Sequence, residues 1–251
     1  MAISPIRRGL RVARRFLAVA FCTSACLAEY FIDFLVGRRA LSQRTFPLHR
    51  WSGVALRWLG ARVVVEGTLP ESGLIVSNHL SYLDILVFSA VADCAFVAKQ
   101  EVKAWPGVGW IATLAGTIYI DRSRRSATHG IQPEIAAALA ARARLVIFPE
   151  GTSSDGRQIL PFRSSLLQPA IEDRAPITAA SISYEIEDGD PAVDVCYWGT
   201  MTMGPHALKL FGKSGVRATV RFGQQAQVFT DRKEAVRILQ DEVAELKGVR
   251  A

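Results

Sequence analysis

The chain has 251 residues, of which 50% are hydrophobic and 21% are charged, and this balance excludes an intrinsically disordered protein. Its net charge of +7 suits an anionic bilayer, an acidic substrate or a nucleic acid. We expect no nucleic-acid partner, because the arginines gather around an apolar segment and no recognised nucleic-acid-binding motif is present.

Residues 1–60 are expected to form an N-terminal membrane-associated helical region. Arginines crowd both sides of an uncharged run over residues 16–28, and Glu29 and Asp33 follow that run. A spanning helix needs about 20 apolar residues, and a charge inside the bilayer is costly. We therefore expect one or two helices over 7–37, with the apolar segment lying along or dipping into the cytoplasmic leaflet. A cleaved signal peptide and a helix buried in the core remain alternatives.

From residue 61 onward, short β-rich runs alternate with helical patterns, which predicts one globular domain over 61–251. Strands are expected at residues 62–66, 73–77, 95–98, 116–120, 145–148, 177–184, 193–197 and 216–222. Helices are expected at residues 46–59, 82–92, 131–142, 164–172 and from 231 onward. This alternation predicts an α/β fold with a mixed sheet flanked by helices, preceded by the N-terminal helical segment.

Cysteines and histidines are the residues that would reveal a metal site or a disulfide framework. They are Cys22, Cys26, Cys94 and Cys196, and His49, His79, His129 and His206. Neither set has the paired spacing of metal ligands. We therefore expect no metal and reduced thiols.

His79 follows an apolar strand and precedes a helical pattern, and Asp84 comes five residues later. On a regular helix five residues turn by about 500°, so the two side chains would point roughly 140° apart. They can meet only if His79 lies in the turn before the helix. Asp84 would then hold one ring nitrogen while the other takes a proton from a hydroxyl. The spacing alone is a weak signal, since a histidine at a strand end is more often a satisfied structural residue.

Three further segments change the interpretation of this pair. They are residues 116–122 (Gly-Thr-Ile-Tyr-Ile-Asp-Arg), 148–152 (Phe-Pro-Glu-Gly-Thr) and 175–180 (Ala-Pro-Ile-Thr-Ala-Ala). Together with residues 78–84, and in this order, they resemble the four blocks of the glycerolipid acyltransferases, the family of bacterial 1-acylglycerol-3-phosphate acyltransferases. The resemblance runs from about residue 57 to 222. The fourth block departs from the family, because Thr178-Ala179-Ala180 stand where a proline is usual.

The resemblance implies that His79 is a general base oriented by Asp84, and that the acceptor hydroxyl attacks an acyl thioester directly. It further implies a substrate-binding set at the acceptor site, which is Arg122, Glu150, Gly151, Thr152 and Lys99. Alternatively, Arg122 pairs with Asp121 or Glu101 on the surface and Glu150 caps local backbone. No cofactor is expected beyond acyl-ACP or acyl-CoA as co-substrate, and the expected location is the cytoplasmic face of a bacterial inner membrane.

Ser153 is a departure that bears on the acceptor. Family members that make phosphatidate usually carry an arginine there, which is associated with the acceptor phosphate. Without that cation, the run resembles enzymes that acylate lyso-ornithine lipid. We therefore expect lyso-ornithine lipid as acceptor and lysophosphatidate as the second candidate, unless Arg122, Arg157 or Arg163 supplies the charge. An inactive membrane-binding scaffold is the non-enzymatic alternative.

Overall fold

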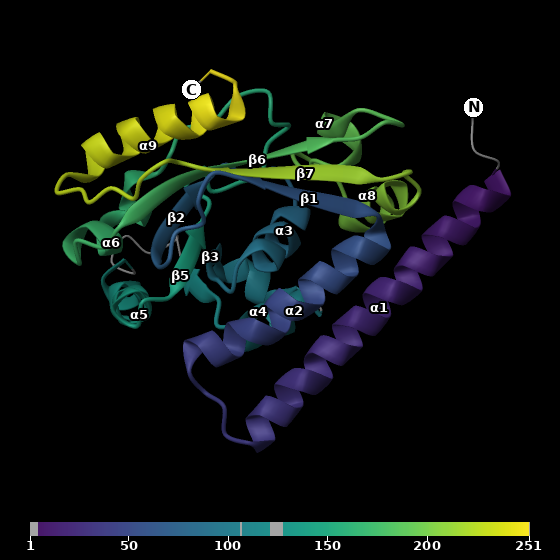
Figure 1. Cartoon of the computed structure of the whole chain (residues 1–251), viewed down its shortest axis with the longest axis horizontal. Helices are drawn as coiled ribbons and strands as arrows, with labels where there is room; N and C mark the ends of the chain where they lie inside the picture. The colour runs from purple at the N-terminus through teal and green to yellow at the C-terminus, as the bar shows by residue number, and fades with distance from the viewer. Residues whose placement is uncertain (1–4, 106, 121–127, 251) are drawn as a thin grey trace.

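A computed structural model describes residues 5–105, 107–120 and 128–250. Its seven-stranded sheet has the order β1-β7-β6-β2-β5-β3-β4 (Figure 1). The strands are β1 Ala61–Glu66, β2 Gly73–Ser77, β3 Ala95–Lys99, β4 Ile118–Ile120, β5 Arg144–Ile147, β6 Ile177–Glu185 and β7 Val216–Phe222. β6 runs antiparallel to β7 and the other neighbouring pairs are parallel, which confirms the predicted mixed sheet.

Helices cover both faces of this sheet, with α9 on one face and α2 and α3 on the other (Figure 1). The helices are α1 Pro5–Leu35, α2 Leu41–Leu59, α3 Leu83–Val91, α4 Val108–Leu114, α5 Thr128–Ala140, α6 Gln168–Glu172, α7 Pro191–Asp194, α8 Met203–Phe211 and α9 Arg232–Lys247. Two 3-10 turns, Gln100–Ala104 and Ser164–Leu166, precede α4 and α6. The α/β class and the flanking helices are therefore as the sequence predicts.

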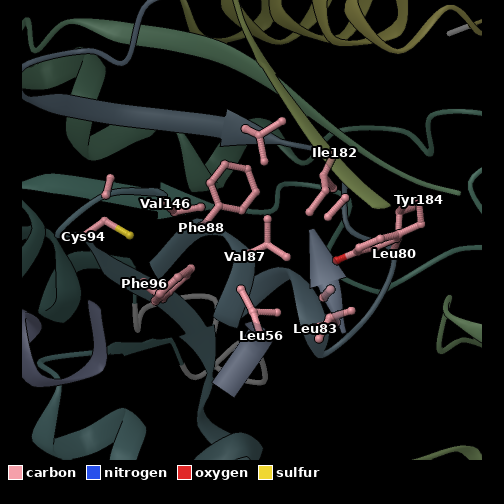
Figure 2. Packing of buried hydrophobic residues seen from close by; sticks show 14 of the residues in the cluster. Leu56, Leu80, Leu83, Val87, Phe88, Cys94, Phe96, Val146, Ile182 and Tyr184 are labelled. Carbon is pink, nitrogen blue, oxygen red and sulfur yellow. The ribbon is translucent and has the colours of Figure 1, made fainter. Parts of the chain in front are cut away.

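Strand β2 shows how the sheet separates two apolar layers. Its alternate side chains point to opposite faces. Ile75 packs into the layer under α2 and α3, whereas Leu74 and Val76 pack into the layer under α9. Figure 2 shows the first layer, in which Phe88 of α3 lies among residues of several elements. Because both faces of β2 are covered, the strand is a rigid support for the turn that follows it.

Glu29 is one of the residues through which helix α1 contacts α2. Glu29 accepts a 2.7 Å hydrogen bond from the Trp51 ring nitrogen and lies 3.6 Å from Arg50, so its charge is compensated within the protein. By length and composition alone α1 could cross a membrane, and only 22% of its most apolar window is buried. That low burial argues against the alternative of a core helix.

The expected strand at 193–197 is wrong. Residues 191–194 form helix α7, because Asp190 caps it by accepting from the Ala192 amide at 2.9 Å and Pro191 occupies its first turn. The predicted helix over 164–172 divides into a 3-10 turn and α6. Both α4 and α8 went unpredicted, since short helices carry little periodic signal.

Candidate active site

The pair singled out in the sequence meets in the structure. β2 ends at Ser77 and α3 begins at Leu83, so His79 lies in the intervening turn, as the angular argument requires. Its Nδ1 is 2.7 Å from Oδ2 of Asp84, whose side chain is fully buried. A carboxylate only accepts hydrogen bonds, so Nδ1 carries the hydrogen and Nε2 keeps its lone pair. The His79 side chain remains 23% exposed.

Asp84 is the centre of a larger hydrogen-bond network. Oδ2 also accepts from the backbone amides of Leu80 at 2.7 Å and Ser81 at 3.0 Å. Oδ1 accepts from the Tyr184 hydroxyl at 2.5 Å. Asp84 thus satisfies amides ahead of α3 from within its first turn, a position where the helix dipole favours negative charge.

Asn78 joins the turn to strand β6. Its side-chain amide nitrogen donates to the carbonyl of Ile182 at 3.0 Å, and its oxygen accepts from the Ile182 amide at 2.8 Å. Both groups are fully buried. This pair of bonds fixes the turn that carries His79 against its neighbouring strand.

Strand β5 brings the third predicted block, residues 148–152, beside His79, because β2 and β5 are parallel neighbours whose carboxyl ends lie at the same edge of the sheet. The ring of Phe148 stacks on the imidazole, with centroids 4.3 Å apart and planes inclined by 15°. Glu150 is buried and accepts from the backbone amides of His79 at 3.4 Å and Leu160 at 3.3 Å. Burial raises the pKa of Glu150 to about 8.

The turn after Glu150 has a backbone that calls for glycine. Gly151 has a φ of 74° and donates to the Phe148 carbonyl at 3.1 Å. Thr152 is exposed beyond it. Ser153 donates through its hydroxyl to the Tyr197 carbonyl, and the Ser154 amide donates to the His79 carbonyl at 3.0 Å. The loop is therefore tied to the turn that carries the imidazole.

Comparison with known proteins gives a consistent answer. A family model described as Acyltransferase matches residues 62–183. The lyso-ornithine lipid O-acyltransferase of Brucella abortus (strain 2308) is 34% identical over 212 residues, which cover 77% of this chain and 78% of that protein. The chain belongs to the acyltransferase family.

Some relatives of this acyltransferase are named for another acceptor, 1-acyl-sn-glycerol-3-phosphate. The 1-acyl-sn-glycerol-3-phosphate acyltransferase of Neisseria gonorrhoeae is 33% identical over 150 residues, covering 56% of this chain and 59% of that protein. The crystal structure of PlsC, the 1-acyl-sn-glycerophosphate acyltransferase of Thermotoga maritima, superposes with a TM-score of 0.68 at 23% identity and covers 96% of this chain and 97% of that one. This last likeness shows the shared fold.

The structure brings together some of the predicted site residues of this acyltransferase. His79, Asp84 and Glu150 converge, with Gly151 in the adjoining turn. Lys99 is the last residue of β3, the strand on the far side of β5 from β2. Arg122 lies outside the described residues.

Two site residues escaped the sequence interpretation. Tyr184 reaches Asp84 from 100 positions away, and Lys247 of α9 donates to the Ile182 carbonyl at 3.5 Å. Burial lowers the pKa of Lys247, while the carboxylates of Asp84 and Glu150 favour its charged form. No spacing pattern near His79 in the sequence predicts that Tyr184 or Lys247 belongs to the site. Among the described residues, no group of three or more His, Cys, Asp and Glu side chains could hold a metal ion.

Proposed function

We propose that this acyltransferase moves a fatty acyl group from an acyl thioester to the hydroxyl of a lysolipid, with His79 as general base. The observation that carries the proposal is the imidazole of His79. Its Nδ1 is held by the buried Asp84 carboxylate, and its partly exposed ring leaves Nε2 as the acceptor of a proton.

The proposed reaction is a direct displacement. As the acceptor oxygen attacks the thioester carbonyl carbon, its proton passes to Nε2 of His79, and Asp84 stabilises the resulting imidazolium. The tetrahedral intermediate then breaks its carbon–sulfur bond. The leaving thiolate takes the proton from His79, which returns to its starting state, and the ester and the free thiol are released.

Lyso-ornithine lipid is the proposed acceptor. The relatives named lyso-ornithine lipid O-acyltransferase from Brucella abortus and Rhizobium meliloti are matched over 78% and 73% of their length, against 59% for the Neisseria gonorrhoeae lysophosphatidate enzyme. Ser153 also supports it, because a hydroxyl bonded to the Tyr197 carbonyl stands where a phosphate-binding arginine is usual. Lysophosphatidate is the second candidate.

The proposed acceptor site includes Glu150, Gly151 and Thr152 of the turn after β5, and Lys99 at the end of β3. Arg122, outside the described residues, is the remaining proposed member. Thr152 is exposed and could contact a headgroup directly, whereas the buried carboxyl of Glu150 would act through the turn that it holds. The proposed donor is acyl-ACP or acyl-CoA, both anionic, which suits a chain of net charge +7.

The proposed location is the cytoplasmic face of the bacterial inner membrane. Large apolar side chains are exposed along α1, among them Leu17 at 68% and Phe21 at 63%. Trp110 of α4 is 66% exposed. Such residues, with arginines nearby, fit a helix lying in the headgroup region.

The acceptor is tested with purified chain in lipid vesicles and a labelled acyl thioester, offered either lyso-ornithine lipid or lysophosphatidate. We expect labelled ornithine lipid to form with the higher kcat/KM. A strong preference for lysophosphatidate would overturn the acceptor assignment and keep acyl transfer. If neither lysolipid is acylated with labelled acyl-ACP or with labelled acyl-CoA, the proposed function is overturned.

A further inference from the structure

Tyr184 of β6 completes the coordination of the Asp84 carboxylate. Oδ2 faces His79 and two backbone amides, while Oδ1 receives the Tyr184 hydroxyl at 2.5 Å. Tyr184 is only 6% exposed. Figure 2 shows its side chain next to Leu80, at the edge of the apolar layer beneath the sheet.

The direction of this hydrogen bond follows from chemistry. Burial and the adjacent Asp84 carboxylate raise the pKa of Tyr184, so the phenol keeps its proton. A carboxylate offers only acceptor oxygens, and the hydroxyl is therefore the donor. The bond withdraws part of the carboxylate charge from the side that faces His79.

The position of the hydroxyl is fixed by the backbone of β6. Asn78 binds the amide and the carbonyl of Ile182, two residues before Tyr184 and on the same face of the strand. Two sets of hydrogen bonds therefore connect the turn of His79 to strand β6. One joins Asn78 to Ile182, and the other joins His79 to Tyr184 through Asp84. Such a closed network leaves the carboxylate a single orientation.

We propose that Tyr184 is a positioning residue that orients Asp84 and tunes how tightly His79 holds its proton. This inference rests on the proposed role of His79 as general base. Tyr184 does not touch the substrate. It acts by sharing the negative charge of Asp84, so that the imidazolium formed during the reaction is stabilised less than it would be by an unshared carboxylate.

The sign of the effect can be worked out. Without the hydroxyl of Tyr184, more negative charge remains on Asp84 to stabilise protonated His79. The base then loses its proton only at higher pH, and the acid limb of kcat/KM moves upward. Since one hydrogen bond is removed, we expect a shift of about half a pH unit to one pH unit.

The test compares pH profiles of kcat/KM for the full chain in vesicles, using wild type and Tyr184→Phe. Tyr30→Phe is the matched control, because it removes a buried hydroxyl that donates to the Arg44 carbonyl at 2.9 Å, away from Asp84. We expect the acid limb of Tyr184→Phe to move upward and that of Tyr30→Phe to stay. If the acid limb of Tyr184→Phe stays or moves to lower pH, and the variant is only less stable than wild type, the proposal is overturned.

Two further measurements keep the test decisive. If Tyr184→Phe does not fold, 3-fluorotyrosine in place of Tyr184 preserves the shape and donates more strongly, and we then expect the limb to move downward. An unmoved limb would again count against the proposal. His79→Ala separates the two levels: its inactivity together with an unmoved limb refutes only the role of Tyr184, whereas wild-type activity of His79→Ala refutes the general base itself.

Discussion

Asp84→Asn tests the hydrogen-bond network most sharply, because it keeps the shape and removes the charge. The amide has two orientations. With its NH2 at the Oδ2 position it would face the donors of His79, Leu80 and Ser81. With its oxygen there it keeps all three bonds, and its NH2 can donate to the oxygen of Tyr184. The second orientation should therefore be the one adopted, and the variant should fold.

The magnitude follows from that orientation. His79 keeps its hydrogen on Nδ1, so the base survives and loses only the charge that stabilises its imidazolium form. A hydrogen bond to a charged group contributes about 1.5–3 kcal/mol and a neutral one about 0.5–1.5 kcal/mol. Losing the difference of about 1–1.5 kcal/mol in the transition state lowers kcat/KM by about 5- to 13-fold. The opposite orientation would give the wrong tautomer and a loss of about 10⁴-fold, as in a serine-protease triad.

The assay is kcat/KM with labelled thioester, alongside thermal unfolding. Asp231→Asn serves as control, because Asp231 caps α9 by accepting from the amides of Lys233 and Glu234, and asparagine caps equally well. We expect the control to match wild type. If folded Asp84→Asn stayed within about threefold of wild type, the role given to Asp84 would be refuted. A loss as complete as that of His79→Ala would refute the orientation argument.

Three other outcomes are expected. Burial raises the pKa of Glu150 from the usual 4.5 to about 8, so its contribution to stability is full below pH 4.5 and is lost as pH rises toward 8. In urea unfolding, the free energy of unfolding of wild type should fall over that pH range relative to that of Glu150→Gln. Parallel pH dependences of the two free energies would contradict this. Gly151→Ala should cost about 1–2 kcal/mol of stability because of the positive φ, whereas Gly53→Ala, in open space on α2, should cost none in the same measurement. Leu17→Glu should lower the affinity for anionic vesicles, measured by cosedimentation, by about tenfold, whereas Val65→Glu on β1 should leave it unchanged. Equal affinities of the two variants would argue against α1 as the lipid-facing helix.

The sequence predicted those parts of the site that lie at strand ends. The apolar runs before His79 and Phe148 were recognisable as buried strands, and parallel neighbours bring their carboxyl ends together. The divergence of His79 and Asp84 on a straight helix correctly required the histidine to lie in the turn. The comparisons confirm the acyltransferase family and the enzyme class.

Long-range contacts were beyond local patterns. Tyr184 meets Asp84 only because β6 pairs with β2 in one particular register, and no spacing within either segment encodes that pairing. Lys247 enters from the last helix for the same kind of reason. At residues 193–197, alternating apolar side chains indicated a strand, but the Asp190-Pro191 helix start outweighed them.

Single-turnover acyl transfer by His79→Ala is the most direct test of the central claim, that this imidazole deprotonates the lysolipid hydroxyl. His49→Ala is the matched control, since His49 binds the Ser89 carbonyl at 2.6 Å away from the Asp84 network. We predict that folded His79→Ala forms no labelled product above background while His49→Ala reacts like wild type. Transfer by His79→Ala at the wild-type rate would contradict the account.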